Sequence, residues 1–122
     1  MPLALDDIRV LLVEDDPIIG LDLRDTVAAA GAVVLGPAHD VKSALALLET
    51  STVDVAVLDH VIVGGDSRPI ADLLIQRGVP FLFHTSHRDD LPARYPTVTI
   101  VDKPSHPDEL VRSLKTLVVK RP

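Results

Sequence analysis

Short runs of apolar residues alternate along this chain with segments in which apolar residues recur every three or four positions. An apolar run that ends abruptly is typical of a buried parallel strand, and the wider spacing is typical of an amphipathic helix. Strands are expected at residues 8–13, 33–35, 53–58, 80–83 and 98–101. The repeating strand–helix order predicts an α/β fold with a five-stranded parallel sheet, helices on both faces and right-handed crossovers.

Polar residues at the expected helix ends support this order. Asp16, before Pro17, and Asp40 each stand where an N-cap is needed, and Gly31 ends the first helix. Ser105 predicts the start of the last helix, because Asp108 stands three residues later and completes a capping box. Three helices of the pattern therefore have a predicted beginning.

Two stretches interrupt the regular alternation of strands and helices. The pair Gly64–Gly65 predicts a turn after the third strand. Between the fourth and fifth strands, Pro92 and Pro96 interrupt helical hydrogen bonding, so the fourth helix is expected to be shortened to a turn. No linker, low-complexity segment or longer repeat is recognised, so residues 1–122 are interpreted as one domain without an output domain.

Composition narrows the function classes. Aromatic residues make up only 2% of the chain and there is no cysteine, which predicts an aliphatic core and excludes disulfides and thiolate metal sites. The formal net charge of −6 argues against a nucleic-acid partner, which would need a basic stripe. We find no signal peptide and no run of membrane-spanning length, so we expect a cytoplasmic protein without membrane contact.

The candidate chemistry stands at the strand ends. Glu14 and Asp15 follow the first strand, Asp59 the third, Thr85 the fourth and Lys103 the fifth. If these strands run parallel, their carboxyl ends meet at one sheet edge, where ligands bind in such folds. Three carboxylates close together need a cation or a lysine to neutralise them, and Mg²⁺ prefers oxygen ligands. Asp59 would then serve as a carboxylate nucleophile for phosphoryl transfer.

These residues, in this order and each at a strand end, resemble the receiver domains of two-component response regulators, the CheY-like family. The likeness extends from Val10–Pro17 through Asp59 and Thr85–Ser86 to Asp102–Pro104. It implies a flavodoxin/CheY-like fold and a phosphoryl group taken onto Asp59 from a phosphohistidine, with Mg²⁺ as cofactor. A module of this kind is not an enzyme, although it promotes its own phosphorylation and dephosphorylation.

The resemblance also implies roles for single residues. Asp59 matches the phospho-acceptor, Asp15 a direct metal ligand and Glu14 a ligand through water. The backbone carbonyl of Val61 matches a further metal ligand. Thr85 matches the hydroxyl that senses the phosphoryl group. These assignments concern positions that match the family's pattern in this sequence.

Lys103 matches the family's lysine, and its bond to Pro104 is expected to be cis. Ile100 departs from the pattern, since the family commonly has a switching Tyr or Phe there. We therefore expect rearrangement to centre on Thr85, Ser86 and the following loop.

Other residues near the site are interpreted as modulators. His60, Ser86, His87 and Ile100 are the candidates, and His87 and Val61 are expected to influence how water reaches a phosphorylated Asp59. A histidine metal site is not favoured, because strand alternation turns His84 away from the site if Thr85 faces it.

The segments Pro80–Thr85 and Leu91–Tyr95 are similar to those of single-domain receivers in alphaproteobacterial stress and light signalling. Expected partners are a sensor histidine kinase or a histidine phosphotransfer protein, together with an output protein that the sequence does not identify. The oligomeric state is open between a monomer and a weak dimer, and the partner surface is expected at the last helix, the fifth strand and the Pro92 region.

Two alternatives remain. One is a receiver-like interaction domain that acts without phosphorylation, favoured by Ile100 and the shortened helix. The other is a phosphohydrolase of the haloacid dehalogenase type, whose chemistry needs a second aspartate where this chain has Val61.

Overall fold

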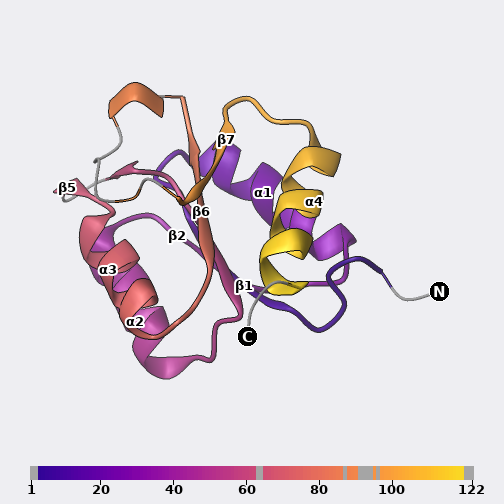
Figure 1. The fold of residues 1–122 in the computed structure, drawn as a ribbon, viewed down its shortest axis with the longest axis horizontal. Helices are drawn as coiled ribbons and strands as arrows, with labels where there is room; N and C mark the ends of the chain where they lie inside the picture. The colour runs from indigo at the N-terminus through magenta and orange to yellow at the C-terminus, as the bar shows by residue number, and fades with distance from the viewer. Residues whose placement is uncertain (1–2, 63–64, 87, 91–94, 96, 120–122) are drawn as a thin grey trace.

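A central sheet of five parallel strands organises the computed structural model, which describes residues 3–62, 65–86, 88–90, 95 and 97–119 (Figure 1). The strand order is β2-β1-β3-β6-β7. The strands are β1 (Arg9–Val13), β2 (Val33–Ala38), β3 (Val55–Leu58), β6 (Phe81–Thr85) and β7 (Thr99–Asp102). The helices are α1 (Pro17–Ala29), α2 (Val41–Thr50), α3 (Arg68–Gln76) and α4 (Pro107–Val119). The predicted doubly wound α/β architecture is confirmed, and strand ends differ from the prediction by at most three residues.

The two faces of the sheet carry separate cores. Alternate residues of a strand point to opposite faces, so Val10 and Leu12 of β1 pack on one side and Leu11 and Val13 on the other. The first side is covered by α1 and α4, and the second by α2 and α3 (Figure 1). All four of these β1 side chains are fully buried, as expected for a central strand of a parallel sheet.

The predicted caps of α1 and α2 are confirmed. A side-chain oxygen of Asp16 accepts hydrogen bonds from the backbone N–H groups of Ile18 and Ile19, at 2.9 and 3.2 Å. Asp40 accepts one from the N–H of Ser43 at 2.7 Å. Each cap satisfies an amide that has no partner within its helix.

The predicted capping box of the last helix is wrong. Helix α4 begins at Pro107, two residues after Ser105, and the N–H of Asp108 donates to the His106 ring at 3.1 Å. The Ser105 hydroxyl instead lies 3.0 Å from Nε2 of His84. The Ser105 side chain therefore contacts strand β6 and does not cap α4 as the local pattern had predicted.

Two irregular features were not predicted. Strand β2 runs on to Ala38 past a cis Gly36–Pro37 bond, and Gly36 has a φ of +99°, with Leu12 O only 2.7 Å from where a Cβ would stand. Glycine is therefore required at that position. The segment after β3 forms a hairpin of β4 (Val61–Ile62) and β5 (Gly65–Asp66), where only a turn was expected.

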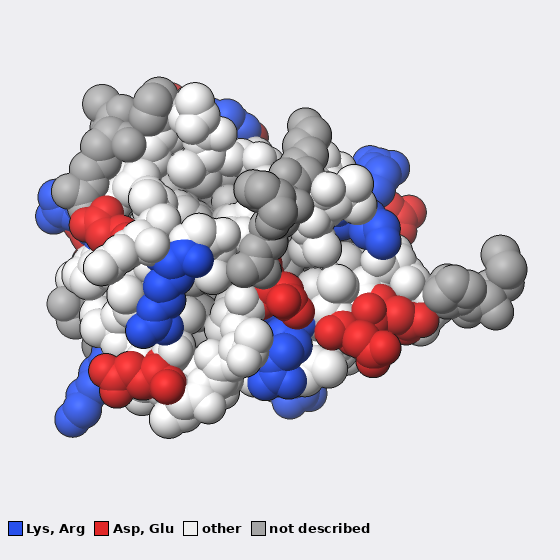
Figure 2. Space-filling view, turned by 60° about the horizontal axis from the view of Figure 1, so that its bottom comes forward, with Lys and Arg blue, Asp and Glu red and all other residues white. Residues whose placement is uncertain are grey.

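Between β6 and β7 the described residues contain one 3₁₀ turn, η1 (Arg88–Asp90), in agreement with the expected short turn (Figure 1). Residues 91–94 and 96, including Pro92, lie outside the described residues. On the face drawn in Figure 2, the described acidic and basic side chains are interspersed. In the part of the chain that the structure describes, no helix is long and apolar enough to cross a membrane.

Candidate functional site

The carboxyl ends of β1 and β3 bring the acidic residues together. The N–H of Asp59 donates to the carbonyl of Val13 at 2.9 Å, so the backbone of Asp59 lies directly beside the end of β1. Carboxylate oxygens of Glu14, Asp15 and Asp59 lie within 4.8 Å of one another. The juxtaposition expected from parallel strands is therefore present.

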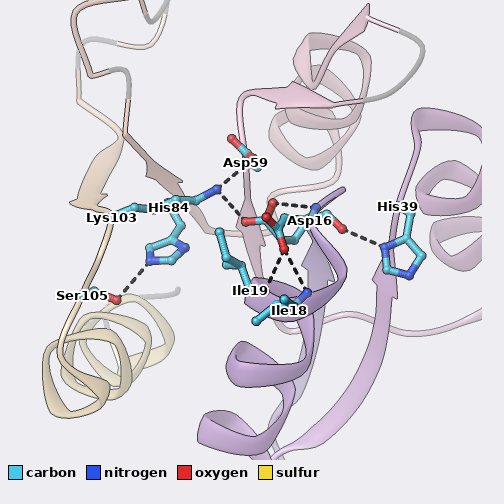
Figure 3. A network of polar contacts seen from close by, with 9 residues as sticks. Asp16, Ile18, Ile19, His39, Asp59, His84, Lys103 and Ser105 are labelled. Carbon is cyan, nitrogen blue, oxygen red and sulfur yellow. Dashed lines mark hydrogen bonds and ion pairs between the residues drawn. The ribbon is translucent and has the colours of Figure 1, made fainter.

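Lys103 neutralises part of this cluster. Its ammonium lies 2.9 Å from Oδ2 of Asp59 (Figure 3). It also lies 2.6 Å from Oε1 of Glu14. The Lys103 side chain is 13% exposed and that of Glu14 1%, so water screens the pair little. The remaining Glu14 oxygen accepts a hydrogen bond from the N–H of Asp16 at 3.2 Å. Lys103 thus joins the last strand to the acidic edge of the sheet.

Burial decides the protonation of these groups. It raises the pKa of Glu14 to about 7, although hydrogen bonds from Lys103 and from the Asp16 amide act in the opposite direction. The nearby negative charge of Asp59 adds to the upward shift. Burial also disfavours the charged form of Lys103, but its bonds to Glu14 and Asp59 outweigh this and raise its pKa. The site therefore holds a charged lysine and an acid that ionises reluctantly.

The acidic cluster fits a small divalent cation. Oxygens about 2.1 Å from an octahedral Mg²⁺ are separated by roughly 3 to 4 Å, which is compatible with the spacing among Glu14, Asp15 and Asp59. All the donors are carboxylate oxygens, the type this cation prefers. Asp15 and Asp59 are half-buried or at the limit of burial, so the cluster is reached from solvent on their side.

Thr85 and Ser86 flank the site on the neighbouring strand. Thr85 is fully buried at the end of β6, and its carbonyl accepts a hydrogen bond from the N–H of Lys103 at 2.9 Å. Ser86, the next residue, is exposed. The Lys103–Pro104 bond is cis, as expected from the resemblance.

His84 points away from the acidic cluster. Its ring lies on the α1 and α4 side of the sheet and contacts Ser105 (Figure 3). It therefore does not join Asp59 in a histidine metal site. The sequence interpretation did not favour that role, and it did not find the Ser105 contact. The sequence signal for that contact was the alternation of side chains along β6.

An aromatic ring does pack near Ile100, although Ile100 itself is aliphatic. Ile100 contacts the core cluster that contains Phe81, Phe83 and Tyr95. The Tyr95 ring lies 5.5 Å from that of Phe83, and its hydroxyl donates to Asp72 of α3 at 2.7 Å. Tyr95 is only 7% exposed, so it is a core residue.

The remaining candidate residues near the site are His60, Val61 and His87. His60 is buried next to Asp59, its carbonyl accepts from the N–H of Ser67 at 3.0 Å, and its Nδ1 has no hydrogen-bond partner among the described residues. The backbone of Val61 pairs with Asp66 in the hairpin. His87 lies outside the described residues.

Comparison with solved structures places this geometry in a family. The chain is 32% identical to SdrG from Sphingomonas melonis Fr1, covering 94% of this chain and 98% of that one with a TM-score of 0.80. It is 25% identical to the signal receiver domain of a modulated diguanylate cyclase from Desulfovibrio desulfuricans G20, covering 95% and 97% with a TM-score of 0.82. The chain belongs to the response-regulator receiver domains.

The receiver fold also matches the response regulator PhyR from Brucella abortus, at 23% identity and a TM-score of 0.82. The match covers 95% of this chain and 50% of PhyR, so this receiver domain spans about half the length of that protein. No family model and no curated protein matches the sequence. The assignment therefore rests on solved structures, and it places the chain among receivers of two-component signalling.

Proposed function

We propose that this receiver domain, residues 1–122, accepts a phosphoryl group on Asp59 in a Mg²⁺-dependent reaction and passes the signal on by protein contact or onward transfer. The observation that carries the proposal is the contact of Asp59 with Lys103 at 2.9 Å, inside a cluster with Glu14 and Asp15. A nucleophile, a counter-cation and carboxylate ligands for a metal are thereby held at one edge of the sheet.

The proposed reaction is an in-line displacement at phosphorus. An oxygen of Asp59 forms a new P–O bond while the P–N bond of a phosphohistidine breaks, and the imidazole nitrogen keeps the electron pair and takes a proton. Such transfers depend mainly on positioning and on stabilising charge. When bound by Glu14, Asp15 and Asp59, with the carbonyl of Val61, Mg²⁺ supplies positive charge to the phosphoryl oxygens.

Chain residues supply the rest of the proposed chemistry. Lys103 moves its ammonium from the Asp59 carboxylate to a phosphoryl oxygen as charge develops there. The Thr85 hydroxyl donates to another, and Ser86, His60, His87 and Ile100 modulate the lifetime of the product. Phosphoryl donors are a sensor histidine kinase or a histidine phosphotransfer protein. The module acts in signalling and does not turn over a substrate.

Intact mass spectrometry with acetyl phosphate tests this function. The wild-type protein is expected to gain one phosphoryl group in the presence of Mg²⁺ and none after chelation. Asp59→Asn is expected to gain none under either condition. The exposed control Asp89→Asn in η1 is expected to behave as wild type.

Absence of a mass gain in folded wild-type protein with Mg²⁺, repeated with a phosphorylated histidine phosphotransfer protein as donor, would contradict the proposal. A phosphorylation-independent interaction domain would then account better for the fold. A mass gain that persists in Asp59→Asn would place the acceptor elsewhere.

A further inference from the structure

His84 is a buried histidine that the proposed chemistry leaves unused. It is the fourth of the five residues of β6 and only 4% exposed. Its Nε2 lies 3.0 Å from Oγ of Ser105, and its Nδ1 has no hydrogen-bond partner among the residues that the structure describes. A buried polar side chain with a single contact has a strong preference for keeping that contact.

The direction of the His84–Ser105 bond follows from the unpaired nitrogen. Burial, and then the charge of Lys103, lowers the pKa of His84 to about 4, so the ring is neutral and carries one proton. A buried N–H without an acceptor is rarer and costlier than a buried acceptor without a donor. We therefore assign the proton to Nε2, which then donates to Ser105, and Nδ1 is the nitrogen without a proton.

The His84–Ser105 bond links β6 to the segment after β7 beyond the point where their backbone hydrogen bonds end. Thr85 pairs with Asp102 in the β6–β7 ladder, and the N–H of Lys103 donates to the carbonyl of Thr85 at 2.9 Å. The next residue, Pro104, has no N–H, so main-chain bonding ends there. The His84–Ser105 bond joins strand β6 to the segment that follows β7, just beyond this point (Figure 3).

Packing does little to hold the same segment from the helix side. A cavity of about 330 Å³ lies between α1 and α4 and the chain from Lys103 to Ser105. Its walls are formed by Ile19, Leu23 and Leu110 from the helices and by His84 from the sheet. Without the bond to His84, the segment that carries Lys103 has room to shift toward this cavity.

We propose that His84 is a positioning residue for phosphoryl chemistry at Asp59, acting through Ser105 to hold Lys103 beside Thr85. The proposal rests on the proposed function. Lys103 must reach both Asp59 and an incoming phosphoryl oxygen, so a loose backbone at Lys103 would slow the transfer and weaken binding of a phosphoryl mimic. Metal binding should change little, because its carboxylates belong to the ends of β1 and β3 and the charge of Lys103 is retained in these variants.

Four variants test this role: Ser105→Ala, His84→Leu, the double variant, and His84→Gln, whose amide nitrogen can stand near the Nε2 position. Two quantities are measured in each, the rate of phosphorylation by acetyl phosphate and the affinity for beryllofluoride with Mg²⁺. Ser105→Ala and His84→Leu are each expected to lower the phosphorylation rate and the beryllofluoride affinity by about five- to tenfold. The double variant is expected to show no larger decrease than either single variant. His84→Gln should recover most of the loss, and Ser113→Ala in α4 is the matched control.

Two further measurements separate positioning from general damage. The Mg²⁺ affinity of each variant is expected to stay within about twofold of wild type, and thermal unfolding checks that each is folded. A variant that is simply disordered would lose Mg²⁺ affinity and phosphorylation together, and His84→Gln would not recover it.

The outcomes distinguish the two proposals. If wild type is phosphorylated and Ser105→Ala matches it in both quantities, the positioning role is overturned alone. The positioning role is also overturned if the double variant shows the combined decrease of the two single variants in phosphorylation rate and beryllofluoride affinity. If wild type takes no phosphoryl group from any donor, the proposed function fails, and the positioning role fails with it.

Discussion

The ammonium of Lys103 lies 2.6 Å from a carboxylate oxygen of Glu14, a side chain that is almost completely buried. The same ammonium contacts Asp59, so one positive charge serves two acids at the edge of the sheet. A divalent cation bound by the acidic cluster would interact with the same carboxylates. Lysine and metal therefore compete for the negative charge of this site.

Lys103→Met should consequently bind Mg²⁺ more tightly than wild type, by about three- to tenfold. Removing the ammonium leaves the acidic cluster without its internal counter-charge, and the cation then supplies it. Titration calorimetry at pH 8 measures this affinity. Lys42→Met, an exposed lysine on α2, is the control and should not change it. Weaker Mg²⁺ binding in Lys103→Met would show that the lysine supports the metal site instead.

Neighbouring aspartates at 15 and 16 should separate metal binding from stability. Asp15→Asn is expected to lower Mg²⁺ affinity at least tenfold with little effect on folding, because it removes an anionic ligand. Asp16→Ala is expected to lower the free energy of unfolding by about 1 kcal/mol, since the α1 cap is lost. Urea denaturation and Mg²⁺ titration of both variants check the pair. Equal effects of the two substitutions on Mg²⁺ affinity would argue against Asp15 as a ligand.

The hydroxyl of Tyr95 should stabilise the β6–β7 connection through Asp72. Tyr95→Phe keeps the ring packed on Phe81 and Phe83 and removes the 2.7 Å bond, so the free energy of unfolding should fall by about 1 kcal/mol. Tyr95→Ala should cost roughly 3 kcal/mol, because the ring is buried. Urea denaturation distinguishes them. A Phe variant as unstable as the Ala variant would mean that the hydroxyl, not the ring, dominates.

Acid should destabilise the protein through His84. Its pKa falls from 6.5 to about 4 on folding, so the unfolded chain binds more protons between these values. The stability that neutral His84 contributes is therefore present above pH 6.5 and lost as the pH falls toward 4, by about 3 kcal/mol in all. Glu14 acts in the opposite sense, since its pKa is raised and stability is lost as the pH rises toward 7.

Comparison with a His84→Gln variant isolates the histidine from Glu14. Free energies of unfolding measured from pH 7.5 to pH 4.5 should fall more steeply in wild type than in the variant. Parallel curves for the two proteins would show that His84 titrates in the folded state much as it does in the unfolded chain.

The strand ends and the acidic residues could be predicted from the sequence because both are local signals. An apolar run such as 55–58 must be buried, and the carboxylate that ends it must lie at the sheet edge. Given parallel strands, topology alone then gathers Glu14, Asp59 and Lys103. The caps at Asp16 and Asp40 are likewise local, since a side chain reaches its own helix.

Tertiary structure alone decided the contacts between distant segments. Ser105 could cap a helix or bond to His84, and the choice depended on how the loop after β7 packs against β6. The pairing of Tyr95 with Asp72, the β4–β5 hairpin and the strand order that sets β1 beside both β2 and β3 are of the same kind. Local patterns specify what each segment can form, whereas the partner of a polar side chain is selected by the packing of the whole chain.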